Sequence, residues 1–193
     1  MSPVTHFLTG WVLANAADLD RRDRALVTLA AVVPDVDGLG IVPEIMTRNS
    51  PHPLLWFSQY HHTLHTLLFA AFVSLCAFLV SNRRCKSASL ALVAFHLHLL
   101  EDIVGSRGPD GFNWPIPYLF PFSDRWVWTW GGQWKLNAWP NIALTVGLLC
   151  VTVWMAVKGG FSPVQLFSPT ADRSVVAVLR KRFQSFQRLS SQG

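Results

Sequence analysis

The sequence predicts an all-α membrane protein: a multi-helix bundle of two antiparallel hairpins and a further transmembrane helix, with an aromatic-rich loop and a C-terminal amphipathic helix. The composition is the first indication, because the 193 residues are 51% hydrophobic and only 14% charged, whereas soluble domains usually carry about 25% charged residues. The second is that apolar stretches alternate with short basic turns. We therefore expect one membrane-embedded domain over residues 1–157, followed by a basic tail over residues 158–193.

The first hairpin is predicted between residues 4 and 37. An apolar stretch over residues 4–17 leads to the basic turn at residues 21–24, and a second stretch over residues 25–33 returns and ends at Asp35 and Asp37. Each stretch is shorter than the about 17 residues that cross a bilayer. Partial penetration is expected, and burial in a soluble core is the alternative on length alone.

The second hairpin repeats this arrangement. A helix is predicted to begin at His61 to His65 and to run through the 17 apolar residues 64–80 to a basic turn at residues 82–86. The returning helix, residues 87–102, ends at His98 and Asp102. Both hairpins thus have basic residues at the closed end and potential metal ligands at the open end.

A last membrane helix is predicted over the 18 residues 140–157. It is preceded by a segment of prolines and many aromatic residues, residues 105–139. Tryptophan and tyrosine favour the membrane-water interface, so we expect an interfacial lid over the ligand end of the bundle. The alternation of Trp126, Trp128 and Trp130 is alternatively typical of a short strand in a hairpin whose turn is Gly131-Gly132.

The basic charge lies in the tail alone. From Lys158 onward there are six basic residues and one acid, whereas residues 1–157 carry ten of each, so no direct binding of nucleic acid is expected. Within residues 174–190, apolar residues recur at helical spacing beside basic ones, which predicts a surface helix that lies on anionic lipid or docks a protein partner. These residues are Val175, Val178, Leu179, Arg180, Lys181, Arg182, Phe183, Phe186, Arg188 and Leu189.

The positive-inside rule orients the predicted bundle. The two basic turns and the tail belong on the cytoplasmic side, so the ligand end should face the outer side of the membrane.

Antiparallel packing of the two hairpins would bring four ligand clusters together at one end. On a helix, residues four apart share a face, so the pair His61 and His65 could bind one ion, with His62 in place of His61 as an alternative. The pair His98 and Asp102 has the same spacing. Mixed imidazole and carboxylate ligands favour zinc, with manganese or iron as alternatives. The predicted ligands of one to three ions are His6, Asp35, Asp37, His61, His62, His65, His98 and Asp102.

Residues for catalysis and substrate binding can be named on the same basis. Asp35, or Glu101, is a candidate to take a proton from an attacking water; Glu101 is one residue from Asp102 and so points about 100° away on a helix. Arg107 and Arg125 are candidates to bind a phosphate. A metal transporter or sensor, and a non-enzymatic anchor that recruits a partner through its basic tail, are the alternatives.

The order of the motifs resembles a known family. Thr5-His6-Phe7-Leu8-Thr9-Gly10, Pro34-Asp35-Val36-Asp37, His65-Thr66-Leu67-Leu68 and His98 with Asp102 are similar to the YdjM-type family of inner-membrane metal-dependent hydrolases, also described as LexA-binding. The similarity spans roughly residues 1–125.

The resemblance implies a helical metallohydrolase distantly similar to zinc-dependent phospholipase C and P1-type nucleases, in which His98 and Asp102 match a metal-binding pair. The implied setting is the inner membrane, with several membrane passes. The function expected is hydrolysis of a phosphoester or lipid-like ester by metal-activated water, with membrane lipids and a small amphipathic substrate as partners.

Overall fold

The computed structural model describes residues 1–108 and 111–190, and the side chains of residues 1–108 and 111–185. It is almost entirely helical, with one small sheet. Residues 109–110 of the predicted lid, and the side chains of residues 186–190 of the predicted tail helix, lie outside the described part; Phe186, Arg188 and Leu189 are among them.

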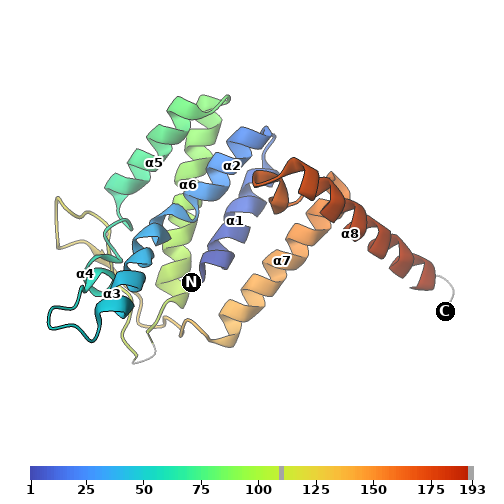
Figure 1. The fold of residues 1–193 in the computed structure, drawn as a ribbon. Coiled ribbons are helices and arrows are strands. Elements are labelled where there is room, and N and C mark those ends of the chain that lie inside the picture. Colours follow the sequence, from blue (N-terminus) through green and yellow to red (C-terminus); the bar gives the residue numbers. More distant parts are fainter. Residues whose placement is uncertain (109–110, 191–193) are drawn as a thin grey trace.

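Five helices form the bundle (Figure 1): α1 (Pro3–Ala16), α2 (Arg21–Ala30), α5 (Leu67–Val80), α6 (Arg84–Gly105) and α7 (Trp139–Gly159). The helix α6 is central and packs against α1, α2 and α5, while α7 packs against α1. Small side chains fill the α1–α2–α6 contact, among them Ala14, Ala30, Ala91 and Ala94, which lets the helix axes approach closely. This prediction of an all-α bundle is confirmed at the level of helical class.

Membrane-spanning character depends on both the length and the apolar composition of a helix. Helices α6 and α7 are each long and apolar enough to cross a membrane. Helix α2 and residues 33–47, which are bent by 50° at their junction, form a third candidate span if the two are taken as one broken span. The helix predicted over residues 140–157 corresponds to α7, whereas α5 is apolar but shorter.

The two basic turns are joined by a buried carboxylate. Asp23 accepts hydrogen bonds from the backbone N–H groups of Asn82, at 2.8 Å, and Arg83, at 2.7 Å, directly before α6. Asp20 caps the start of α2 by accepting from the Asp23 N–H. Both turns therefore lie at one end of the bundle, remote from the first residues of α1 (Figure 1).

The prediction that a helix begins at His61 is wrong. A short helix, α4 (Trp56–Tyr60), ends there, and residues 61–66 form turns before α5 starts at Leu67. The physical reason is the cap of α5: Thr66 has an extended backbone, and its Oγ1 accepts from the Phe69 N–H at 3.2 Å. The histidines of this segment therefore do not share a helix face.

The Pro34-Asp35-Val36-Asp37 motif lies in a 3₁₀ helix, η1 (Val33–Gly40). Pro34, near the start of η1, suits this position because its missing N–H is not needed in a first helical turn. A further short helix, α3 (Ile41–Thr47), follows directly.

The aromatic segment contains the strand that the tryptophan alternation suggested, but its turn lies elsewhere. Strand β1 (Ile116–Pro117) pairs antiparallel with β2 (Val127–Trp128), so the hairpin turn precedes β2 and Gly131-Gly132 is not part of it. The pairing is stabilised by the Tyr118 ring, which stacks on Trp128 with ring centroids 3.9 Å apart.

The last elements are a 3₁₀ turn, η2 (Pro163–Leu166), and the helix α8 (Pro169–Ser190), which extends away from the bundle (Figure 1). Asp172 accepts hydrogen bonds from the backbone N–H and hydroxyl of Ser162. Arg180 donates to the Val157 carbonyl at the end of α7, at 2.9 Å. These contacts fix the start of α8 at the basic end of the bundle.

Candidate metal centre

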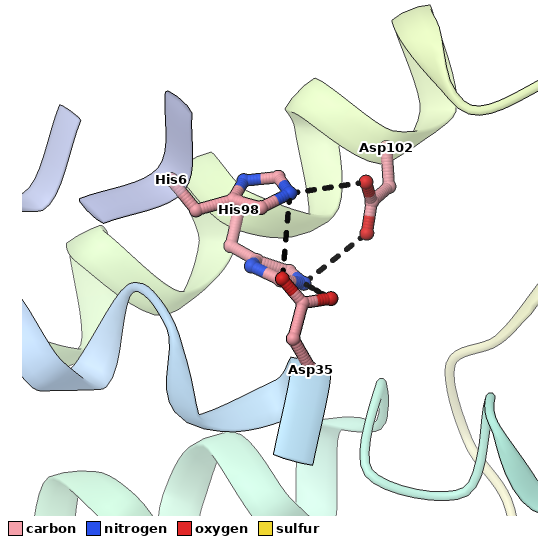
Figure 2. Close-up of side chains that lie close together, drawn as sticks. All are labelled: His6, Asp35, His98 and Asp102. Atoms are coloured by element: carbon pink, nitrogen blue, oxygen red, sulfur yellow. Dashed lines mark ion pairs between the residues drawn. The ribbon is translucent and has the colours of Figure 1, made fainter. Parts of the chain in front are cut away.

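Five potential metal ligands converge at the open end of the bundle: His6 of α1, Asp35 of η1, His65 before α5, and His98 and Asp102 of α6. The three imidazoles and Asp102 are buried and Asp35 is partly exposed. Figure 2 shows His6, His98, Asp35 and Asp102 pointing toward a common centre, with ion pairs between each histidine and each carboxylate.

The distances between the donor atoms suit a metal ion. The Nε2 atom of His6 lies 3.3 Å from an Asp102 oxygen, and Nε2 of His98 lies 3.1 Å from the other. Asp35 oxygens lie 3.8 to 3.9 Å from the same two nitrogens. For a tetrahedral zinc ion with bonds of about 2.0 Å, neighbouring ligand atoms are about 3.3 Å apart.

His65 completes the group from the opposite side. Its Nε2 lies 3.1 Å from His98 Nε2, 3.5 Å from Asp102 Oδ2 and 3.9 Å from Asp35 Oδ1. All three Nε2 atoms thus face the same two carboxylates.

The other ring nitrogens of two histidines are held by outer partners. His98 Nδ1 donates to the Ala31 carbonyl at 2.9 Å, and His6 Nδ1 donates to Glu101 Oε2 at 2.6 Å. Glu101 in turn accepts from the Thr9 hydroxyl at 2.5 Å. A metal-binding histidine usually donates its second N–H to a carbonyl or carboxylate, because this leaves the Nε2 lone pair free for the ion.

Three buried atoms of the centre lack the partner that burial requires. His6 Nε2, Asp35 Oδ2 and His65 Nδ1 make no hydrogen bond with the rest of the described chain. Buried polar atoms are almost always paired, so His6 Nε2 and Asp35 Oδ2, which face the other ligand atoms, each have a lone pair available for a cation. The charge of two carboxylates matches that of a divalent ion, and the residues present therefore fit a metal.

Asp37 and His61 lie beside this group. Asp37 Oδ1 accepts from His61 Nδ1 at 2.8 Å, and Oδ2 accepts from the Leu64 N–H at 3.1 Å. The same Oδ2 lies 3.7 Å from His65 Nδ1. The two aspartates of η1 thus lie on either side of the His65 ring.

The charge around His65 favours a cation. Burial by itself would lower the pKa of His65, but the nearby carboxylates of Asp102 and Asp37 outweigh burial and raise the pKa to about 9. The pKa of His62 is lowered, chiefly by burial. Of the two alternatives, it is His61 that contacts Asp37 and reaches the adjoining cavity.

A cavity of about 240 Å³ opens onto the centre at Asp35 and Asp102. Its walls include Phe57 and Trp114, whose rings lie against His61 at 4.4 and 4.9 Å between centroids. Trp114 is thus the aromatic residue of the predicted lid that borders the site.

The two arginines that the sequence suggested for substrate binding are separated. Arg107 lines the cavity, and its Nε donates to the Gly111 carbonyl. Arg125 is exposed and lies outside the lining of this cavity.

Three residues were not predicted to contact the centre: Met1, Thr9 and Ser106. The Met1 amino group donates to Asp102 and to the Ser106 hydroxyl, and Ser106 donates to Asp102 at 2.7 Å. Thr9 supports Glu101 as described above. The spacing of Ser106 four residues after Asp102 is a helical signal that would have identified it, whereas the contact of Met1 depends on the packing of α1 against α6.

The fold and the centre define a class: helical membrane proteins with a buried His/Asp group able to hold a metal ion. Residues 1–180 match the family described as YdjM inner membrane protein, and the chain belongs to that family. The predicted resemblance is confirmed, over a longer stretch than the roughly 125 residues that carried it. Comparisons with curated proteins and with solved structures gave no match.

Proposed function

We propose that this inner membrane protein is a metal-dependent hydrolase whose ion is held by His6, Asp35, His65, His98 and Asp102. The observation that carries the proposal is the convergence of ligand atoms from His6, Asp35, His98 and Asp102, all within 4.8 Å of one another. Zinc suits this set best, with manganese or iron as alternatives. Asp37 and His61 are the proposed ligands of a second ion, because they contact each other beside His65.

A bound metal ion would supply activation of water and neutralisation of a developing oxyanion. The chain itself supplies the remaining parts. Asp35 is our candidate for the proton acceptor, because its Oδ2 has no hydrogen-bond partner and the residue lines the cavity. Both oxygens of Glu101 are engaged, with His6 and Thr9, so we assign Glu101 to positioning His6 in place of proton transfer.

The cavity limits the substrate. A volume of about 240 Å³ is below the roughly 300–1,000 Å³ of pockets that enclose a drug-sized ligand. It suits a headgroup-sized phosphoester or ester, with Arg107 beside the phosphoryl oxygens and Phe57 and Trp114 against an apolar part. The rest of a lipid-like substrate would stay in the bilayer.

The position of the centre along the helices agrees with such a substrate. His98 lies fourteen residues beyond Arg84 on α6, which is about 21 Å at about 1.5 Å per residue. The hydrocarbon core of a bilayer is about 30 Å thick. With the basic turns at the cytoplasmic surface, the centre would lie in the outer half of the hydrocarbon core, about 9 Å below its outer boundary, and the active site would open toward the outer side.

A metal transporter or sensor is a weaker candidate. Transport sites usually lie near the bilayer midplane between repeats, whereas these ligands gather at one end of the bundle beside an open cavity. The anchor hypothesis rests on the tail and predicts that deletion of residues 170–193 abolishes function but leaves metal binding unchanged.

Metal content tests the proposal. We would measure zinc, manganese and iron by elemental mass spectrometry on the full chain purified in detergent, comparing the wild type with Asp35→Ala. His96→Ala is the matched control, because His96 lies on α6 two residues before His98 but bonds to the Tyr118 hydroxyl outside the centre. We expect stoichiometric metal in the wild type and the control, and loss of it in Asp35→Ala.

Protein that carries metal would then be tested for release of phosphate or alcohol from phosphoesters and phospholipids. Activity that requires both the metal and Asp35 would support the hydrolase. A wild type that holds no metal, even after it is added back, would rule the proposal out.

A further inference from the structure

Residues 39–60, which we call the α3–α4 hairpin, expose a continuous apolar face. Leu39, Val42, Ile45 and Met46 are between 52% and 80% exposed and recur at the spacing of one helix face. No residue of α3 is buried. In water, a short helix would show the opposite pattern, with its apolar face covered and its polar face exposed.

Two polar side chains of α3, Glu44 and Thr47, are satisfied from within the hairpin, whereas the polar loop residues 48–50 and His52 are exposed. Glu44 lies on the face of α3 opposite the exposed one, and its carboxylate accepts from the Ser58 N–H at 2.9 Å and the Ser58 hydroxyl at 2.5 Å. Thr47 donates to the Pro43 carbonyl and accepts from the Leu54 N–H, each at 2.8 Å. Internal pairing of polar groups is what a lipid environment requires, because lipid offers them no partners.

The hairpin also continues directly from a candidate membrane span. Residues 21–30 and 33–47 together are apolar enough to cross a membrane and are bent by 50° at their junction, just before Asp35. Trp56 and Tyr60, on the returning α4, are both half exposed and are of the types that favour the membrane interface. The apolar face is therefore joined to the membrane part of the chain through the helix that carries a proposed metal ligand.

We propose that the α3–α4 hairpin is inserted into the lipid leaflet on the metal-centre side, with Leu39, Val42, Ile45 and Met46 among the acyl chains. The hairpin then holds Asp35 and Asp37 within the same leaflet. A consequence that rests on the proposed function is that the substrate enters the cavity laterally, from the leaflet and not from bulk water.

Site-directed fluorescence tests the insertion. In a full chain whose native cysteines are replaced by serine, Met46→Cys would carry an environment-sensitive fluorophore and the protein would be placed in phospholipid nanodiscs. Val42→Cys is a second site on the same face. Arg22→Cys is the matched control, because Arg22 is exposed at the opposite end of the bundle. We expect nitroxide on the acyl chains to remove most of the fluorescence at positions 42 and 46, and aqueous iodide to quench only position 22.

Two results would overturn the insertion. Quenching of positions 42 and 46 by iodide would place the face in water. Protection from both quenchers would show that protein covers it, for example a second copy of the chain. Metal content measured on the same samples tests the proposed function separately. If positions 42 and 46 are quenched by the lipid nitroxide but the protein holds no metal, the metal centre is refuted and the insertion is not.

Discussion

At the residue scale, the chemistry depends on which atom of each side chain is free. The three imidazoles of the centre present Nε2 to Asp35 and Asp102 because partners outside the centre engage or face Nδ1. Glu101 is such a partner: its charge strengthens the hydrogen bond from His6 Nδ1 and makes the ring a better ligand.

Replacing Glu101 by Gln should therefore weaken metal binding without abolishing it. The amide can still accept from His6 Nδ1, but the negative charge is lost, and loss of an outer partner of this kind typically costs about 10- to 100-fold in affinity. Competition with a chromogenic chelator would measure the effect. Asp124→Asn, which removes an exposed carboxylate in the aromatic segment, is the control, and an equal loss in both variants would contradict the role of Glu101.

At the element scale, two buried polar side chains tie helices together. Asp23 joins the α1–α2 turn to the start of α6, and Asn141 joins the start of α7 to the end of α6. The Asn141 amide donates to the carbonyls of Gly105 at 2.8 Å and Leu136 at 2.9 Å and accepts from the Trp134 indole. Each side chain satisfies backbone groups that no helix can satisfy itself.

Asp23→Ala should destabilise the bundle by about 2 kcal/mol, because it leaves two N–H groups before α6 without an acceptor. Thermal unfolding in detergent would show a lower midpoint. Asp18→Ala is the comparison, since Asp18 pairs with Arg83 at the same turn but in full contact with solvent, where ion pairs contribute little. Equal midpoints for the two variants would refute the proposed cap.

Asn141→Leu should lower stability by a similar amount, about 2 kcal/mol, because the buried Gly105 carbonyl, the part-buried Leu136 carbonyl and the Trp134 indole N–H lose their partner. The neighbouring Ile142→Ala is the control, since Ile142 is largely exposed on the outer face of α7. Unfolding followed by tryptophan fluorescence would compare them, and an unchanged midpoint for Asn141→Leu would show that the contact is dispensable.

At the scale of the whole molecule, the basic turns and the metal centre occupy opposite ends of the bundle. The positive-inside rule then predicts the orientation. Cys85 is exposed in the first turn of α6, at the basic end of the bundle. Cys150 is exposed on α7, within a candidate membrane span, so the two thiols should differ in their access to water.

A membrane-impermeant maleimide should accordingly leave intact spheroplasts unlabelled and should label Cys85 in inverted membrane vesicles. Cys150 should resist in both, because a thiol surrounded by lipid does not form the reactive thiolate. Asp124→Cys, at an exposed position of the aromatic segment and in a background without native cysteines, should show the reverse of Cys85. Labelling of Cys85 from outside would invert the proposed topology.

The helical class, the family and the candidate ligands could be predicted from the linear order of the residues. Helical class and the apolar helix at residues 140–157 follow from composition and segment length, because a bilayer requires long uncharged helices. The family follows from four short motifs in a fixed order. The candidate ligands were all visible as ionisable groups in apolar surroundings, where they are costly and therefore rarely accidental.

The tertiary structure decided which of these groups act together and on what backbone. Only Arg107 of the two candidate arginines lines the cavity, and Glu101 contacts His6. Residues 61–65 lie in turns, because a threonine cap starts α5 later than the apolar run suggests. Sequence spacing specifies angles only within one helix. Distances between elements, such as the contact of His65 with His98, arise from the packing of helices that are far apart along the chain.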